Sequence, residues 1–498
     1  MALWVAMGGS ACAGHAARTA TARDALDRGR PRLALSALNQ ALGVQAASEL
    51  PAQLDDAKLL FVLDRAMVLQ QTGLHRWSSR DLEVADKGIE ILDFSRKKVH
   101  EMGRYLFSDD TGPYRAPAYE KLLINTFNML NYLVRRDLSG ARVEARRFTV
   151  MRRFLRGKDG KVPPIAALGS QLAGFVFEKS GATNEALRHY ADALAHSRIA
   201  ALQGPVRSLT GEVQPRDPVL RRTLADAARC LPAAPTDAST AAPPAASNPP
   251  DTQPKAPSTA SGDSAPRAAV IGRGAALQSA PLRCPPAPHP RCLAGEPCGE
   301  MLVWVASGRV PAKVARRMPI GLALTFASPF LSPYNQTRAR RMAAQGLVTW
   351  VNFPELAPLG GPYAMPRVHI NGQRFAVESV AAIDQSAYDT WQGHRGTIIA
   401  AALVRTLARA AVGEGARRVT GGGTLGTLLS LGSQAALTAR DTPDTRSWAT
   451  LPARVHLLRL RLPAGHYRIH TAARGYRRAF RVRLAANDWA VVSLTALR

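Results

Sequence analysis

The sequence has few acidic residues, few lysines and few aromatic residues. Aspartate and glutamate number 37 against 65 lysines and arginines, which gives a formal net charge of +28, and arginine outnumbers lysine roughly five to one. Aromatic residues make up only 6% of the chain, yet 46% of all residues are hydrophobic. That apolar content excludes a wholly disordered protein. A length of 498 residues predicts about two or three domains.

The excess of positive charge has two interpretations. A strong positive field attracts phosphates, lipid headgroups and nucleic acid over long distances. An arginine-rich, lysine-poor chain is also what a GC-rich bacterial genome encodes, and the arginines are spread along the whole length. The sequence alone leaves both interpretations open.

Residues 1–15 form a short apolar segment in which small residues directly precede Cys12. This pattern is typical of the end of a bacterial lipoprotein signal peptide, where a diacylglycerol on the cysteine anchors the protein. The basic segment that normally comes first is missing, and Gly9 stands where a branched aliphatic residue is usual. The sequence predicts a lipid anchor at Cys12, and an ordinary N-terminus with a buried thiol is the alternative.

The other four cysteines form no paired Cys-x-x-Cys motif. An even number of thiols suits disulfides in an oxidising periplasm, with a connectivity that the sequence leaves open. Zinc binding is the alternative, because His289 lies among three of them, but the spacing fits no common zinc pattern. The candidates for disulfides are Cys230, Cys284, Cys292 and Cys298.

Residues 16–231 show the apolar spacing of paired helices. The clearest unit runs from Gly169 to Ala195, with a turn at Gly181, and resembles a tetratricopeptide repeat. Small residues in such a unit let antiparallel helices approach closely. Weaker copies surround Gly29, Gly73 and Asp137. The pattern predicts an α-solenoid.

The third of these units carries more polar residues than solubility requires. A solvated helix face and a peptide-binding groove both explain such a pattern. The residues that stand out are Tyr119, Glu120, Asn131, Tyr132, Glu144 and Arg147.

Residues 232–298 are rich in proline, alanine and serine and predict a disordered linker that contains the cysteine cluster. Residues 299–498 predict a β-sandwich-like domain with an inserted helical pair at about 386–439. The fold class is therefore α+β and multidomain. The strands expected before the helical pair are Met301–Val305, Gly321–Phe326, Val348–Phe353, Arg367–Ile370 and Phe375–Val380.

The C-terminal tail, from Val455 to Leu494, alternates apolar and basic residues and predicts strands with one apolar and one basic face. The stretch Leu462–Tyr467 followed by Gly475 and Tyr476 resembles the small PEGA-type β-sandwich modules of bacterial surface proteins.

Two segments together carry a wider resemblance. Tyr119–Arg147, and Asp444-Thr-Arg446-Ser-Trp448 with Leu451 and Pro452, are similar to an uncharacterised family of bacterial lipoproteins with tetratricopeptide-like N-terminal helices. The resemblance implies an outer-membrane or periplasmic location and no catalytic residues. It also places Asp444, Arg446, Trp448 and Pro452 in a family-like segment of unknown role. Asp444 and Arg446 are spaced to pair through a turn, and Trp448 is placed to anchor the next strand on the helices.

No convincing catalytic constellation emerges. Gly421–Gly426 matches a dinucleotide-binding motif but follows no buried strand. Ser95 and Lys98 match a serine-nucleophile motif without its companion motifs. The uncharged stretch Val419–Ala439 holds too many small polar residues for a membrane span and predicts a helix packed on its predecessor.

The sequence thus predicts a non-enzymatic envelope lipoprotein without cofactor or metal, anchored at the outer membrane and facing the periplasm. Its helical-repeat groove would bind an envelope protein or peptide. The alternative is a binder of nucleic acid or of an anionic polymer such as lipid headgroups or cell wall, with nucleic acid disfavoured by a periplasmic location. A cell-wall enzyme is the third possibility.

Overall fold

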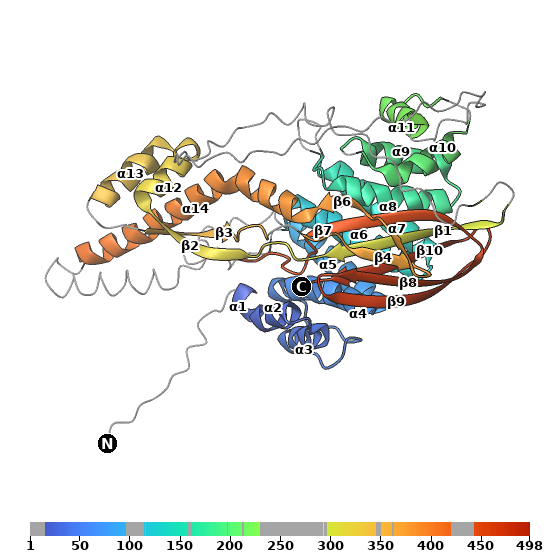
Figure 1. The fold of residues 1–498 in the computed structure, drawn as a ribbon. Coiled ribbons are helices and arrows are strands. Elements are labelled where there is room, and N and C mark those ends of the chain that lie inside the picture. The colour runs from blue at the N-terminus through green and yellow to red at the C-terminus, as the bar shows by residue number, and fades with distance from the viewer. Residues whose placement is uncertain are drawn as a thin grey trace, which may run out of the picture.

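The structure is a computed structural model that describes residues 15–95, 114, 116–156, 162–196, 198–211, 214–229, 292, 296–344, 350–360, 363–419 and 443–498. Helices fill the N-terminal part and most strands lie in the C-terminal part (Figure 1). The helices are α1 (His15–Arg18), α2 (Ala20–Asp27), α3 (Pro31–Leu42), α4 (Asp56–Thr72), α5 (His75–Ser95), α6 (Ala118–Val134), α7 (Leu138–Phe154), α8 (Ala166–Lys179), α9 (Thr183–Leu194), η3 (Ala200–Leu202), α10 (Gln203–Thr210), α11 (Pro218–Arg229), α12 (Ile320–Ala327), η4 (Ser328–Phe330), α13 (Pro333–Ala344) and α14 (Ile383–Val419).

The strands form three sheets. One sheet has the order β10-β1-β7-β6, a second has the order β5-β4-β8-β9, and β2 pairs with β3. We call the first the inner sheet and the second the outer sheet. The strands are β1 (Cys298–Ser307), β2 (Lys313–Pro319), β3 (Trp350–Leu356), β4 (Arg367–Ile370), β5 (Gln373–Phe375), β6 (Glu378–Ala382), β7 (Arg454–Pro463), β8 (Gly465–Ala473), β9 (Tyr476–Leu484) and β10 (Trp489–Ala496).

The N-terminal helices pair as their sequence pattern predicts: α2 with α3, α4 with α5, α6 with α7, and α8 with α9. Gly73 ends α4 in a left-handed conformation, with φ of 84°, which lets the chain reverse into α5. Within the last pair, a Cβ atom on Gly174 of α8 would lie 2.4 Å from the Tyr190 ring of α9. Close helix approach therefore depends on a missing side chain at this position.

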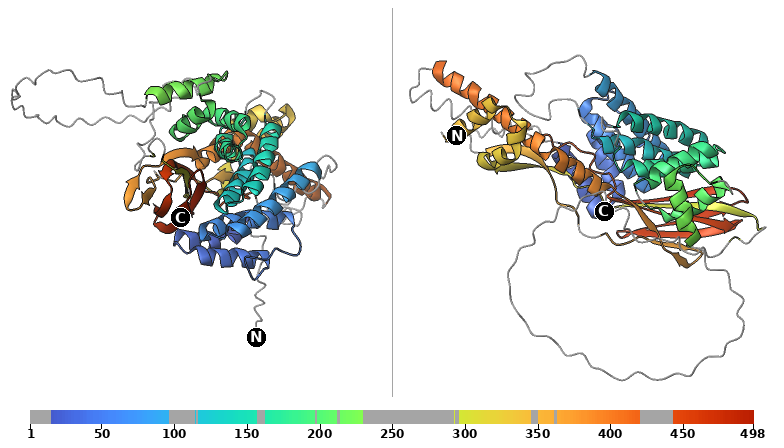
Figure 2. Two further views of the ribbon diagram at one scale, coloured as in Figure 1. Left: turned by 90° about the vertical axis from the view of Figure 1, so that its right-hand side faces the viewer. Right: turned by 90° about the horizontal axis from the view of Figure 1, so that it is seen from above.

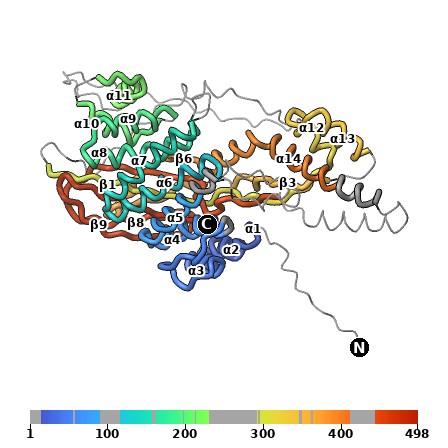
Figure 3. Tube along the Cα trace, turned by 180° about the vertical axis from the view of Figure 1, so that it is seen from behind, coloured from blue at the N-terminus to red at the C-terminus, as the bar shows by residue number. Residues whose placement is uncertain are grey.

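The inner sheet lies between the helices and the outer sheet. On β1, Leu302, Trp304 and Ala306 belong to the core shared with the helices, whereas alternate residues such as Met301 and Val303 belong to the core shared with the outer sheet. Figure 2 shows the helices on one side of the strands. In Figure 3, the view from behind, α6 to α8 lie in front of the strands. The core that includes the helices thus continues into the strands beyond residue 298.

Pairing in the inner sheet joins distant parts of the chain. β1 runs parallel to β10 and antiparallel to β7, with Trp304 opposite Ser493 on one side and opposite Leu457 on the other. Because β10 is the last strand, the inner sheet forms only when both ends of the C-terminal region come together.

Two predicted strands are wrong in detail. Gly321–Phe326 lies in helix α12, because its continuous run of apolar residues lacks the alternation of a strand and Pro319 precedes the first helical turn. The predicted strand Phe375–Val380 is two strands: β5 ends at Phe375 in the outer sheet, and β6 begins at Glu378 in the inner sheet. The chain changes sheets between them.

The tail forms four strands, but two arginines depart from the predicted basic face. On β9 the exposed Arg477, Arg481 and Arg483 alternate with less exposed residues, and Arg478 is one of the latter, with its guanidinium 5.1 Å from the centre of the Phe480 ring. β7 lies between β1 and β6 in the inner sheet. Its Arg459 points toward the helices, and only 3% of the Arg459 side chain is exposed. It pairs there with Glu178 at 2.7 Å and with Glu300.

The first helix of the predicted helical pair is present as α14. This helix packs on α12, α13 and β3. These elements, together with β2, extend to one side of the layered region (Figure 1). The second helix of the pair, like the motif Gly421–Gly426, lies outside the described residues apart from Val419.

Candidate functional site on the helical region

The segment that follows Asp444 docks between two N-terminal helices. The indole Nε1–H of Trp448 donates to the carbonyl oxygen of Leu63 at 2.9 Å, and its backbone N–H donates to Glu120 at 3.2 Å. The backbone N–H of Thr450 donates to Asp64 at 3.0 Å. All four side chains of this junction, those of Trp448, Glu120, Thr450 and Asp64, are buried. Trp448 therefore anchors the start of β7 on α4 and α6, as the sequence indicates.

The pair Asp444 and Arg446 forms as its spacing predicts. Arg446 Nε lies 2.8 Å from Asp444 Oδ1, and the same oxygen accepts the backbone N–H of Arg446 at 3.0 Å. The Arg446 guanidinium lies 5.9 Å from the centre of the Tyr114 ring. Pro452 is buried two residues before β7 begins. These contacts make the segment a structural junction between helices and strands.

Glu120 is the buried carboxyl group of this junction. Burial raises its pKa, and hydrogen bonds from Tyr114, Tyr119 and Trp448 oppose that rise. The Tyr119 hydroxyl lies 3.2 Å from Glu120 Oε1, and Tyr114 donates to the other oxygen. With 1% of Glu120 exposed, its role is to hold the segment around Trp448.

Asn131 lies at the centre of a second buried polar network. Its side-chain oxygen accepts from Gln70 at 2.9 Å and contacts His75 Nδ1 at 3.0 Å, while its amide donates to Ser78 at 2.9 Å. Gln70 also lies 3.5 Å from Thr495 of β10. Desolvation lowers the pKa of His75. The network joins α4, α5 and α6 to the inner sheet.

A third polar cluster differs because it reaches the surface. Asn125 of α6 donates to Glu144 of α7 at 3.1 Å and to Asp86 of α5 at 3.2 Å. Arg147 lies 3.2 Å from Asp86 and 3.6 Å from Glu144, and 31% of its side chain is exposed. Nearby, the Tyr132 hydroxyl donates to Glu83 at 2.5 Å. We call this set, Glu83, Asp86, Asn125, Tyr132, Glu144 and Arg147, the acidic cluster.

Neighbouring carboxyl groups set the electrostatics of the acidic cluster. Arg147 contacts both Asp86 and Glu144. Burial raises the pKa of Glu144 to about 7, and the neighbouring Asp86 and Glu83 add to the rise that Arg147 and Asn125 oppose. A cation brought to this position would relieve the repulsion between the carboxyl groups.

The structure thus divides the polar residues of the third helical unit among three places. Tyr119 and Glu120 join the junction with Trp448, Asn131 lies in the buried network, and the remaining three belong to the acidic cluster. Sequence reasoning missed Glu83 and Asp86. Their spacing of three residues, which puts both on one face of α5, is the signal that was available.

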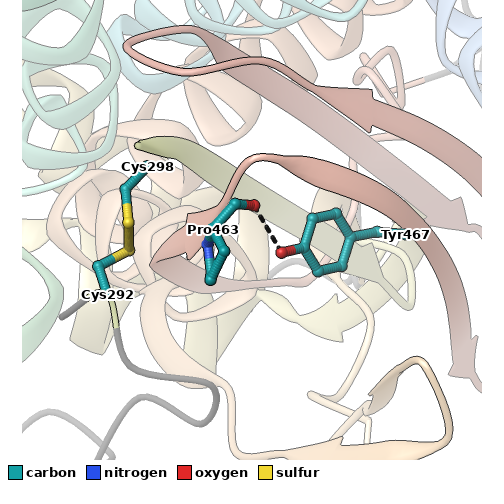
Figure 4. The surroundings of a disulfide bond; sticks show 4 residues. All are labelled: Cys292, Cys298, Pro463 and Tyr467. Atoms are coloured by element: carbon teal, nitrogen blue, oxygen red, sulfur yellow. Dashed lines mark hydrogen bonds between the residues drawn. A yellow bond between two sulfur atoms is a disulfide. The ribbon is translucent and has the colours of Figure 1, made fainter. Parts of the chain in front are cut away.

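Two of the four cysteines predicted to form disulfides are bonded to each other. Cys292 bonds to Cys298 at the start of β1, close to the point where the Tyr467 hydroxyl donates to the Pro463 carbonyl at 2.7 Å (Figure 4). Cys12, Cys230 and Cys284 lie outside the described residues, as do His289 and Lys98. Within the described ranges, no group of three or more metal-binding side chains gathers at one point.

Comparison of the chain with family models, with curated proteins and with solved structures gives no match. No helix in the described part of the chain is both long enough and apolar enough to span a membrane.

Proposed function

We propose that the protein is a non-enzymatic envelope lipoprotein that acts as a protein-interaction scaffold, anchored through Cys12 at the outer membrane and facing the periplasm. The proposal retains the resemblance of its helical and Asp444–Pro452 segments to bacterial lipoproteins. It also assigns the helix pairs to the tetratricopeptide-like solenoids and the two facing sheets to the β-sandwich class.

The acidic cluster is the observation that carries this proposal. The inner sheet covers the side of α4, α6 and α8 where a repeat protein would offer a groove, since Trp304 and Phe127 of α6 are ring neighbours at 6.5 Å. The side formed by α5 and α7 keeps polar groups at the surface. A partner that presents a lysine or arginine there would bring a positive charge next to the neighbouring carboxyl groups of Glu83 and Glu144.

A photo-crosslinking amino acid at Val143 tests this surface. Val143 is 53% exposed and lies one helical turn from Arg147, so a partner at the acidic cluster would be within reach. We expect one discrete adduct in intact cells, strongly reduced by Asp86→Asn together with Glu83→Gln. The control is the same amino acid at Leu33 of α3, which is 55% exposed and distant in sequence. Equal adducts at both positions would contradict a specific surface.

The anchor has its own test, which is incorporation of radiolabelled palmitate with membrane fractionation. Wild type and Cys12→Ser are expressed with the native upstream DNA. Labelling and outer-membrane recovery that disappear in the variant are the expected result. An unlabelled protein found in the cytosol in both cases would overturn the envelope location.

A further inference from the structure

The outer sheet turns a strongly basic face to solvent. Along β8 and β9 the outward residues alternate with the buried Tyr467, Ile469 and Leu484. The outward arginines of the four strands are all exposed, and they are Arg367, Arg374, Arg468, Arg477, Arg481 and Arg483. We call this surface the basic face. The opposite side of the outer sheet packs on the inner sheet.

The register places two like charges directly opposite one another, because Arg468 pairs with Arg481 across β8 and β9. Across β4 and β8, His369 pairs with His470. Facing like charges destabilise a sheet. Toward the turn between β8 and β9 the outward residues Ala472 and Ala479 are small, and a hollow of about 520 Å³ lies beside them. Arg367, Arg477, His369 and His470 are among the residues around it.

The sequence that includes β7, β8 and β9 contains no acidic residue. From Thr445 to Asn487 there are ten arginines and no aspartate or glutamate. None of the six arginines of the basic face has an ion pair within the described residues, whereas on the helices Arg152 pairs with Asp192 and Arg28 with Asp24. A genome-wide preference for arginine does not by itself segregate the two signs of charge in this way.

We propose that the basic face docks on an anionic lipid bilayer, with headgroup phosphates on its arginines and one phosphate in the hollow between Arg367 and Arg477. One guanidinium group can bind two oxygens of a phosphate at once. Outward positions of a sheet are spaced by roughly 5–7 Å along and across the strands, which matches a planar array of anions. No phenylalanine, tyrosine or tryptophan points outward on β8 or β9 to stack on bases, which disfavours single-stranded nucleic acid. This inference goes beyond the scaffold function and does not depend on the acidic cluster.

Vesicle co-sedimentation tests the proposal with the full-length chain, carrying Cys12→Ser in every arm so that no acyl anchor contributes. Vesicles of phosphatidylglycerol and phosphatidylethanolamine are compared with vesicles of phosphatidylcholine alone. We expect binding only to the anionic vesicles, and its loss when salt rises from about 0.1 M to about 0.5 M, because screening shortens the reach of the charges.

The triple variant Arg468→Gln, Arg477→Gln and Arg481→Gln should bind anionic vesicles on the order of 100-fold more weakly, since each arginine near such a surface contributes about fivefold. The matched control removes the same charge from exposed positions of α7 by Arg142→Gln, Arg146→Gln and Arg153→Gln. An equal loss in the control would overturn the proposal in favour of net charge. If the triple variant unfolds, as judged by its urea midpoint, Arg367→Gln with Arg483→Gln replaces it.

Two other outcomes would also overturn the proposal. Equal binding to phosphatidylcholine would show an apolar contact, and tighter binding of single-stranded DNA with the same dependence on Arg468, Arg477 and Arg481 would show a nucleic-acid surface. The crosslink from Val143 should be unaffected by the triple variant. Failure of one proposal therefore leaves the other standing.

Discussion

The indole of Trp448 donates its hydrogen bond to the main-chain carbonyl of Leu63 at 2.9 Å, across 385 positions of sequence. Trp448 is 1% exposed and its ring packs edge-on against Phe127 at 6.5 Å. One side chain thereby joins the strand region to α4 and α6, and the folding of the two parts is coupled.

Replacement of Trp448 should therefore destabilise the whole molecule. Trp448→Ala removes a large buried ring and should lower the free energy of unfolding by about 3–5 kcal/mol. Trp448→Phe keeps most of the ring but removes the additional hydrogen bond to the Leu63 carbonyl, at a cost of about 0.5–1.5 kcal/mol. Urea unfolding measures both. Trp350→Phe, at a side chain 56% exposed, should change stability by less than about 0.5 kcal/mol and serves as the control.

The buried guanidinium of Arg459 should be essential for stability at neutral pH. Arg459→Met leaves Glu178 and Glu300 facing each other and should cost about 3–5 kcal/mol. Arg461→Met, two residues along the same strand but exposed, should cost less than about 0.5 kcal/mol. Equal effects of the two substitutions would contradict the ion-pair assignment.

The effect of Arg459 should also depend on pH. Burial would raise the pKa of Glu300, but the ion pairs with Arg459 and Lys179 outweigh it and lower the pKa from 4.5 to about 2. A lowered carboxyl pKa stabilises the fold above the unfolded value and loses that contribution as pH falls through the folded value. The stability gap between wild type and Arg459→Met should be full above about pH 5 and should shrink toward pH 2, as equilibrium unfolding at several pH values would show.

Glu144 should make the opposite contribution. Its pKa is raised from 4.5 to about 7, so its stabilisation of the fold is complete below pH 4.5 and is lost as pH rises through 7. Glu144→Gln mimics the protonated form. The variant should match wild type near pH 5 and exceed it by about 2–3 kcal/mol at pH 8, measured by urea unfolding. Glu185→Gln, exposed on α9, should show no such trend, and a trend of equal size there would refute the assignment.

The close approach of α8 and α9 should make Gly174 sensitive to a single methyl group. Gly174→Ala places Cβ 2.4 Å from the Tyr190 ring and should cost about 1–3 kcal/mol in thermal or urea unfolding. Gly204→Ala in α10 meets no atom within 4 Å and should be neutral or stabilising by up to about 1 kcal/mol. Similar destabilisation at both glycines would contradict the assignment of the Gly174 effect to packing.

Local pattern was enough to predict the paired helices and most strands. The apolar spacing and the turns at Gly29, Gly73 and Gly181 act within a few residues, and the alternation along β8 and β9 acts in the same way. The strand predicted at Gly321–Phe326 was wrong because a short apolar run carries no period. The outward position predicted for Arg459 was wrong because β7 alternates like the neighbouring strands, although both faces of β7 are covered.

The sequence by itself determined the helix pairs, the two-faced strands of the tail and the spacing that joins Asp444 to Arg446, because each of these depends on neighbours along the chain. Only the tertiary structure decided that Trp448 reaches Leu63, that Asp86 meets Glu144, and that the arginines of β4, β8 and β9 share one face. These relationships depend on strand register and on the packing of helices far apart in sequence, which hydrophobic burial fixes only when the whole core assembles.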